Sequence, residues 1–251
     1  MPTQPTQEIA VRSLADPGLL LTAWEEALAA PAPARTAVLL HRTGLAPDLD
    51  SALDLDVGQC AALATALHRA VYGPEVDGLV GCPACSELLE VHVHLPAADS
   101  GTAGPPGAEP AEARVGAHAV RAPTVRDLLA AADGPGDPRT VLLTRCVRRL
   151  DGRPFDPAAL TPEEEALLDE AAESLTGDAD ALLRTLCPTC GAEVAAAHDM
   201  GAVLWDQVDA AAPALMAEVT ALSRAFGWSE QAVLAMSPFR RHAYLSLAAA
   251  P

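Results

Sequence analysis

Residues 82–85 read Cys-Pro-Ala-Cys, and residues 187–190 read Cys-Pro-Thr-Cys. Each turn follows a short apolar run and precedes a run that can form a strand. The two-residue gap lets both sulfurs of a turn point at the same ion, and the proline fixes one backbone dihedral. Two such turns predict one structural zinc site. Its expected ligands are Cys82, Cys85, Cys187 and Cys190.

Three other interpretations of the paired turns stay open. Dithiol oxidoreductases also use Cys-Pro-x-Cys, but they need the motif at a helix N-terminus that stabilises the thiolate, and here a strand pattern follows the first turn. The others are two local disulfides or free thiols, and an iron–sulfur cluster. Nearby His92, His94 and His198 could replace a thiolate. Four cysteines already complete a tetrahedral shell, so we expect these histidines to be solvated or to lie outside the ligand set.

The residues around the turns have strand patterns. Residues 76–81 predict a strand before the first turn, and residues 88–95 predict one after it, with apolar and polar side chains alternating from residue 89. The apolar face of the second strand carries Leu89, Val91, Val93 and Leu95. Residues 181–186 and 191–197 repeat the arrangement more weakly. We therefore expect two β-hairpins with thiols at their tips, forming a zinc ribbon split by about a hundred inserted residues.

Most of the remaining chain has helical periodicity. Helices are predicted over residues 13–30, 34–43 and about 55–72, the third capped by Asp54 or Asp56. Further helices are expected over 125–132, over 139–150 with three arginines at its C-terminal end, and from a capping box at Thr161 and Glu164 to residue 175. A short strand is expected over 115–120. The longest apolar stripe covers 199–226, and two short helices follow it.

These patterns predict an α+β fold that is mainly α-helical, with a small split zinc ribbon of two β-hairpins and a C-terminal helical hairpin. Residues 1–75 would form an N-terminal helical unit. Residues 76–96 together with 181–198 would form the split ribbon. Residues 97–180 would be an insertion that starts with a flexible Gly- and Pro-rich loop over 97–116. Residues 199–251 would form the C-terminal hairpin.

Composition restricts the function. The chain of 251 residues has a net charge of −18, which opposes binding to nucleic acid or to an anionic membrane surface and suits a protein partner with basic patches. No apolar run has the length of a membrane span, and the first residues lack the pattern of a secretory signal, so we expect a cytoplasmic protein. Because no phosphate loop, nucleophile elbow or His-Glu-x-x-His motif is present, we expect no enzyme and no small-molecule substrate.

The C-terminal sequence carries a family resemblance. Residues 225–230 read Ala-Phe-Gly-Trp-Ser-Glu, residues 233–238 read Val-Leu-Ala-Met-Ser-Pro, and residues 240–245 read Arg-Arg-His-Ala-Tyr-Leu. This run resembles the end of a family of baseplate proteins from contractile phage tails and phage-tail-like contractile injection systems. Injection-system members also carry a Cys-Pro-x-Cys pair in each half and a Leu-Trp segment after the second, here residues 204–205. The resemblance covers roughly residues 15–95 and 120–250.

The resemblance implies a part in assembling the baseplate or hub of such a system, with baseplate, hub or tube proteins as partners. The protein would be either an assembly factor that leaves, which we favour, or a permanent structural component. A CxxC oxidoreductase is the alternative from another class. Candidate partner-binding residues are Trp228, Leu234, Arg240, Arg241 and Tyr244. The competing interpretation of these residues is packing between the last helices.

Overall fold

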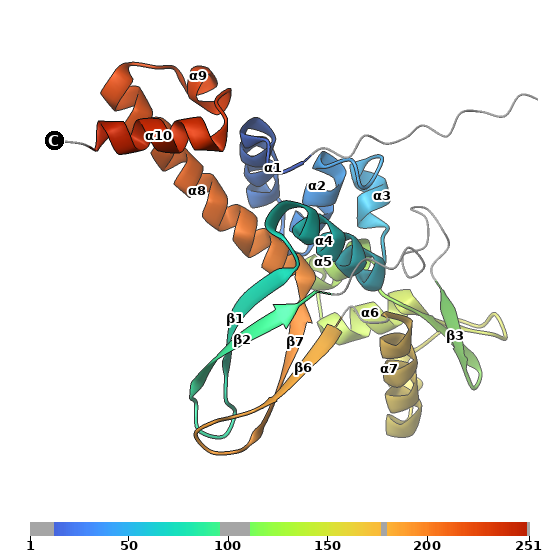
Figure 1. Cartoon of the computed structure of the whole chain (residues 1–251). Helices are drawn as coiled ribbons and strands as arrows, with labels where there is room; N and C mark the ends of the chain where they lie inside the picture. The colour runs from blue at the N-terminus through green and yellow to red at the C-terminus, as the bar shows by residue number, and fades with distance from the viewer. Residues whose placement is uncertain (1–12, 96–110, 177–179, 250–251) are drawn as a thin grey trace, which may run out of the picture.

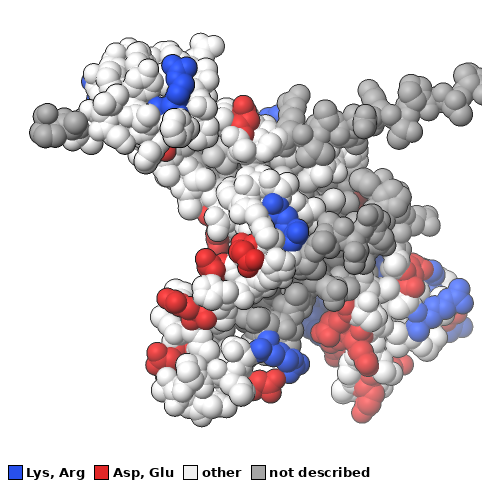
Figure 2. Space-filling view, in the orientation of Figure 1, with Lys and Arg blue, Asp and Glu red and all other residues white. Residues whose placement is uncertain are grey.

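The computed structural model describes residues 13–95, 111–176 and 180–249, except the side chains of 180–183 and 196–198. The fold is α+β and mainly helical, as predicted. Figure 1 shows a helical body from which two long β-hairpins project together, and a C-terminal helical unit at the far end of helix α8. Acidic side chains gather over the hairpins and around α7 on the face that Figure 2 shows, where the C-terminal unit is largely uncharged.

The N-terminal helices are short and well capped. They are α1 (Pro17–Ala29), the 3-10 turn η1 (Ala32–Ala34), α2 (Arg35–Arg42), α3 (Leu49–Leu53) and α4 (Val57–Tyr72). Of the two predicted caps, Asp56 is the one that starts α4, in a capping box with Gln59. Helix α3 was not predicted, because only five residues between two aspartate-containing turns carry no periodic apolar pattern.

The main hydrophobic core joins the N-terminal helices to the first half of α8 (Met200–Phe226). Leu39 and Leu40 of α2 and Leu204 and Val208 of α8 are completely buried in it. Burying each such side chain stabilises the fold by about 1.5–3 kcal/mol. Residues far apart in the sequence therefore share one core, and the start of α8 is fixed by it.

The middle of the chain forms a three-stranded antiparallel sheet in the order β3-β4-β5, against which α7 packs. Its strands are β3 (Glu112–Val115), β4 (His118–Arg121) and β5 (Val147–Arg149). Its helical segments are α5 (Val125–Asp133), α6 (Pro138–Cys146), η2 (Pro157–Ala159) and α7 (Pro162–Thr176). The predicted capping box at Thr161 and Glu164 is confirmed by hydrogen bonds in both directions.

Three predictions for this region were wrong. The single strand over 115–120 is a hairpin that turns at Gly116, whose φ of 55° is left-handed. The predicted loop 97–116 contains β3 at its end, while residues 97–110 lie outside the described part. The helix over 139–150 stops at Cys146 because the next residues pair with β4, so Arg148 and Arg149 bind Glu112 and Asp151 rather than a helix end.

A buried carboxylate links α5 to this sheet. Asp127 is 1% exposed, and its side chain accepts hydrogen bonds from Arg121 at 2.5 Å and Arg145 at 2.6 Å. It also accepts from the backbone N–H of Thr124 in the capping box of α5. Burial raises the pKa of Asp127. The hydrogen bond from Arg121 and those from the other donors lower the pKa by more than burial raises it, so the pKa lies well below its ordinary value.

The C-terminal helices form the predicted hairpin. Gly227, with φ of 71°, ends α8, and Ser229 and Ser237 cap α9 (Glu230–Leu234) and α10 (Pro238–Ala248). Helix α10 packs back on the end of α8. The contact includes Arg241 of α10, which is buried and donates to Glu218 of α8 at 2.9 Å.

Candidate metal centre

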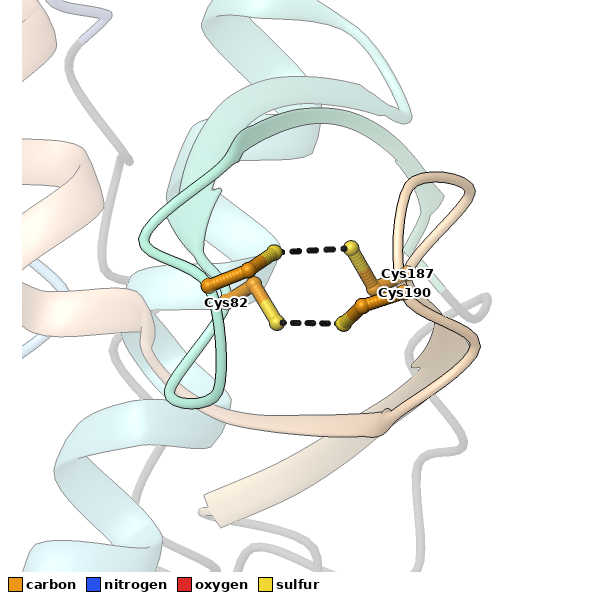
Figure 3. Close-up of side chains that lie close together, drawn as sticks. Cys82, Cys187 and Cys190 are labelled. Atoms are coloured by element: carbon orange, nitrogen blue, oxygen red, sulfur yellow. Dashed lines mark hydrogen bonds between the residues drawn. The ribbon is translucent and has the colours of Figure 1, made fainter.

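Two β-hairpins of equal length carry the four cysteines. The first consists of β1 (Glu75–Gly81) and β2 (Leu88–His94), and the second of β6 (Asp180–Leu186) and β7 (Glu193–Asp199). Both are antiparallel with the same register, so that every paired residue of the second lies 105 positions after its counterpart in the first. In Figure 3 the tips of the two hairpins face each other with their thiols between them. The predicted strand, turn, strand arrangement is therefore confirmed for both turns.

The inner faces of the hairpins form a small core of their own. Cys82, Leu89, Cys187 and Val194 are buried together, with Val80 and Ala192 packed against them. This confirms the predicted alternation after the first turn: Leu89 and Leu95 are buried, whereas Glu90 and the histidines of β2 are exposed. Because few of the described side chains take part, their apolar packing alone gives the hairpins little stability.

The two turns have the same backbone geometry. The amide of Cys82 donates to the carbonyl of Glu87 at 2.8 Å, and the amide of Cys187 donates to that of Ala192 at 2.8 Å. After the second cysteine the backbone is left-handed in both turns, with φ of 61° at Ser86 and 73° at Gly191. Glycine suits this conformation, and serine is strained in it. A serine held in this conformation indicates that the turn geometry itself is required.

The four sulfur atoms lie within 4.8 Å of one another. Across the gap, the Sγ atoms of Cys82 and Cys190 are 3.6 Å apart, as are those of Cys85 and Cys187 (Figure 3). Zinc–sulfur bonds of about 2.3 Å in a tetrahedron place sulfurs about 3.8 Å apart, whereas a disulfide needs about 2.05 Å. All four cysteines are free thiols. Their spacing thus fits a tetrahedral metal ion and not a pair of disulfides.

The thiols are also electrostatically prepared for a cation. The backbone N–H of Ala84 lowers the pKa of Cys82 to about 7. For Cys85, the N–H of Glu87 lowers the pKa, but the neighbouring thiols of Cys190 and Cys187 outweigh it and raise the pKa to about 12. One thiolate forms easily, and its negative charge then opposes deprotonation of the neighbouring thiols. A divalent cation among the sulfurs removes this repulsion and favours loss of the remaining protons.

The histidines near the turns do not join the thiols. His92 and His94 lie on the exposed outer face of β2, where their Nδ1 atoms contact Asp77 at 2.6 Å and Glu75 at 2.7 Å. The hydrogen bond to Asp77 raises the pKa of His92. Both are solvated, as expected, and the side chain of His198 lies outside the described residues. Within the described part, the four cysteines are the one group of three or more metal-binding side chains close enough to share an ion.

The predicted partner-binding residues are distributed between surface and interior. Trp228 is half-buried and stacks on Phe226, while its edge contact to Tyr244 has ring centroids 4.7 Å apart. Leu234 packs against the main core, and Arg240 is exposed beside the ring of Tyr244. Arg241 is buried, so it holds α10 to α8 rather than lying on the surface.

Two exposed apolar residues of α10 were missed. Phe239 is 84% exposed and Leu247 is 65% exposed. They are eight residues apart, with Ala243 midway, so they lie along one side of the helix. The four-residue spacing of Phe239, Ala243 and Leu247 is visible in the sequence. The sequence does not show which side of α10 packs on α8 through Arg241 and which side is exposed.

Comparisons with protein-family models, with curated proteins and with solved structures gave no match for this chain. Among the described residues, none of the helices is both long and apolar enough to cross a membrane.

The geometry of the four thiols indicates what the site can do chemically. Four thiolates fill a tetrahedral shell, so a metal held by them has no position for a substrate or a reactive water. Such an ion would connect the hairpins.

Proposed function

We propose that the protein is a non-enzymatic, zinc-stapled assembly factor for the baseplate or hub of a phage-tail-like contractile injection system and acts in the cytoplasm. The observation that carries the staple is the convergence of four free thiols from two hairpins at the spacing of a tetrahedral zinc site. The cross-gap pairs are 108 and 102 residues apart in the sequence. One ion therefore joins distant parts of the chain.

The assignment to an injection system depends on the resemblance of the C-terminal sequence. Two structural features are consistent with a scaffolding role: the four thiols leave no reactive ligand position, and α10 exposes apolar side chains. Weighing against the alternative of a dithiol oxidoreductase, a strand rather than a helix follows each cysteine pair. In the described chain, therefore, neither turn leads into a helix whose N-terminus could stabilise a reactive thiolate.

Metal analysis tests the staple. Protein purified without chelators should contain about one zinc per chain by elemental mass spectrometry. Cys187→Ser should lose the zinc, whereas Cys60→Ala should keep it, because Cys60 is buried in the main core away from the thiol cluster. Zinc-free protein with four freely titratable thiols at the turns would overturn the staple.

Comparison of assembled particles with cell lysate tests the assembly role. In cells that lack the protein, sheath and tube proteins should accumulate without forming complete particles. An assembly factor should be abundant in the lysate of normal cells and depleted from purified particles. Presence in the particle at a fixed ratio to baseplate proteins would instead identify a permanent component. Normal particle assembly without the protein would refute both roles.

A further inference from the structure

The C-terminal unit presents an apolar side chain that nothing in the described chain covers. Phe239, the second residue of α10, is 84% exposed, and Leu247 continues the same side of the helix. Helix α10 contains two arginines and no aspartate or glutamate, although the chain has 34 acidic and only 16 basic residues. Of these arginines, Arg240 is exposed and Arg241 is buried. This surface is therefore apolar with a positive charge beside it.

A hollow of opposite character lies at the same end of the molecule. It has a volume of about 510 Å³ and is lined by Asp16 and Gly18 from the start of α1 and by Glu230, Gln231, Leu234 and Ala235 of the α9 region. Leu234 provides apolar surface in it, while Asp16 and Glu230 are exposed carboxylates. In Figure 1, α10 starts near α9 and runs from there towards the C-terminus.

The geometry points to a second copy of this chain as the occupant: we infer that two copies form a symmetric dimer in which Phe239 of each enters the hollow of the other. In a two-fold contact the same surface serves both copies, so a projecting group and its receptor must lie near each other on one chain. Here they do: residues from the segment 230–235 in the α9 region line the open hollow, and Phe239 follows that segment four residues later.

Charge favours the same arrangement. Arg240 is the exposed residue next to Phe239 on α10, and Glu230 and Asp16 are exposed carboxylates at the hollow, so the two surfaces carry opposite charges. These are opposite charges at the edge of a contact, where they select the partner and the orientation. Two α10 helices packed directly on each other would instead bring arginines together, so the hollow is the better receptor.

Sedimentation velocity of the full-length protein from about 1 to about 200 μM tests the dimer. The wild type should shift from monomer to dimer over this range, and Phe239→Asp should raise the dissociation constant by about 30-fold or more, as for a central apolar contact. An aspartate near the start of α10 favours the helix dipole, so this variant should fold. Leu167→Asp is the matched control, since Leu167 is 52% exposed on the distant α7.

A charge exchange makes the test specific. Arg240→Glu and Glu230→Arg should each weaken the dimer, and the double variant should recover affinity because the pair is restored with its signs reversed. A protein that remains monomeric at every concentration overturns the proposal. This holds even if Phe239 is found to bind a different protein. A dimer unaffected by Phe239→Asp, or no recovery in the double variant, also overturns it. None of these results depends on the injection-system assignment.

Discussion

Removing the metal should release the two hairpins and leave the helical body folded. Among their described side chains, the hairpins share four that are buried together, of which Leu89 and Val194 contribute about 1.5–3 kcal/mol each. An isolated two-stranded hairpin is marginal in water, whereas structural zinc supplies about 10–16 kcal/mol in small zinc-binding peptides. The metal should therefore provide most of the stability of the hairpins. It should contribute little to the stability of the main core, which contains none of the four ligands.

Hydrogen exchange measured by mass spectrometry distinguishes these regions. After chelation, amides of β1, β2, β6 and β7 should exchange at least about 100-fold faster, which corresponds to about 3 kcal/mol of lost local stability. Amides of α2 and of the first half of α8 should change little. Cys187→Ser should reproduce the pattern, and Cys60→Ala should not. Unchanged hairpins, or cooperative loss of protection throughout the protein, would refute the division of stability argued from the two cores.

Further predictions concern four positions, each checked by urea denaturation. Gly191→Ala should lower the free energy of unfolding of the metal-bound protein by about 1 kcal/mol, because alanine is strained in the left-handed backbone at this position. Ser86→Gly should not lower it, because the backbone at Ser86 is also left-handed and glycine adopts it without strain. Asp127→Asn should cost about 2–4 kcal/mol because it leaves two arginines without their buried partner. In the wild type the depressed pKa of Asp127 stabilises the fold above about pH 4, the unfolded value, and this contribution should disappear as the pH falls further. Leu204→Ala should cost about 2–5 kcal/mol because Leu204 is completely buried.

The features predicted correctly are those set by residues close together in the sequence. A Cys-Pro-x-Cys turn, a two-residue alternation and a capping box each extend over a few positions, so the hairpins and the start of α7 could be predicted without knowledge of the fold. The second hairpin was the weaker prediction because alanines replace β-branched residues in β7. The matching turn and the shared inner face impose the same register there.

The errors occur where distant contacts decide the local structure. The apolar pattern of α6 continues through Val147, but that residue pairs with Val120 of β4 and packs beside Leu168 of α7. Nothing near residue 147 indicates those contacts. For the same reason the sequence predicted the four ligands but not the cross-gap pairing of Cys82 with Cys190, which depends on how the hairpins face each other.

The repeated spacing extends beyond the hairpins. The caps of the preceding helices, Asp56 for α4 and Thr161 for α7, are also 105 positions apart, so the chain contains two helix–hairpin units. The helices pack differently, since α4 joins the main core and α7 covers the middle sheet. Near the turns, the described apolar side chains of each hairpin are buried against the other hairpin, whereas Val76 at the base of the first hairpin is buried in the main core. A metal held by the four thiols would stabilise this contact, and β7 continues directly into α8. At about 1.5 Å per residue, the 27 residues of α8 carry the C-terminal unit about 40 Å away, so the main core, and a metal bound at the hairpins, would together fix where that unit lies.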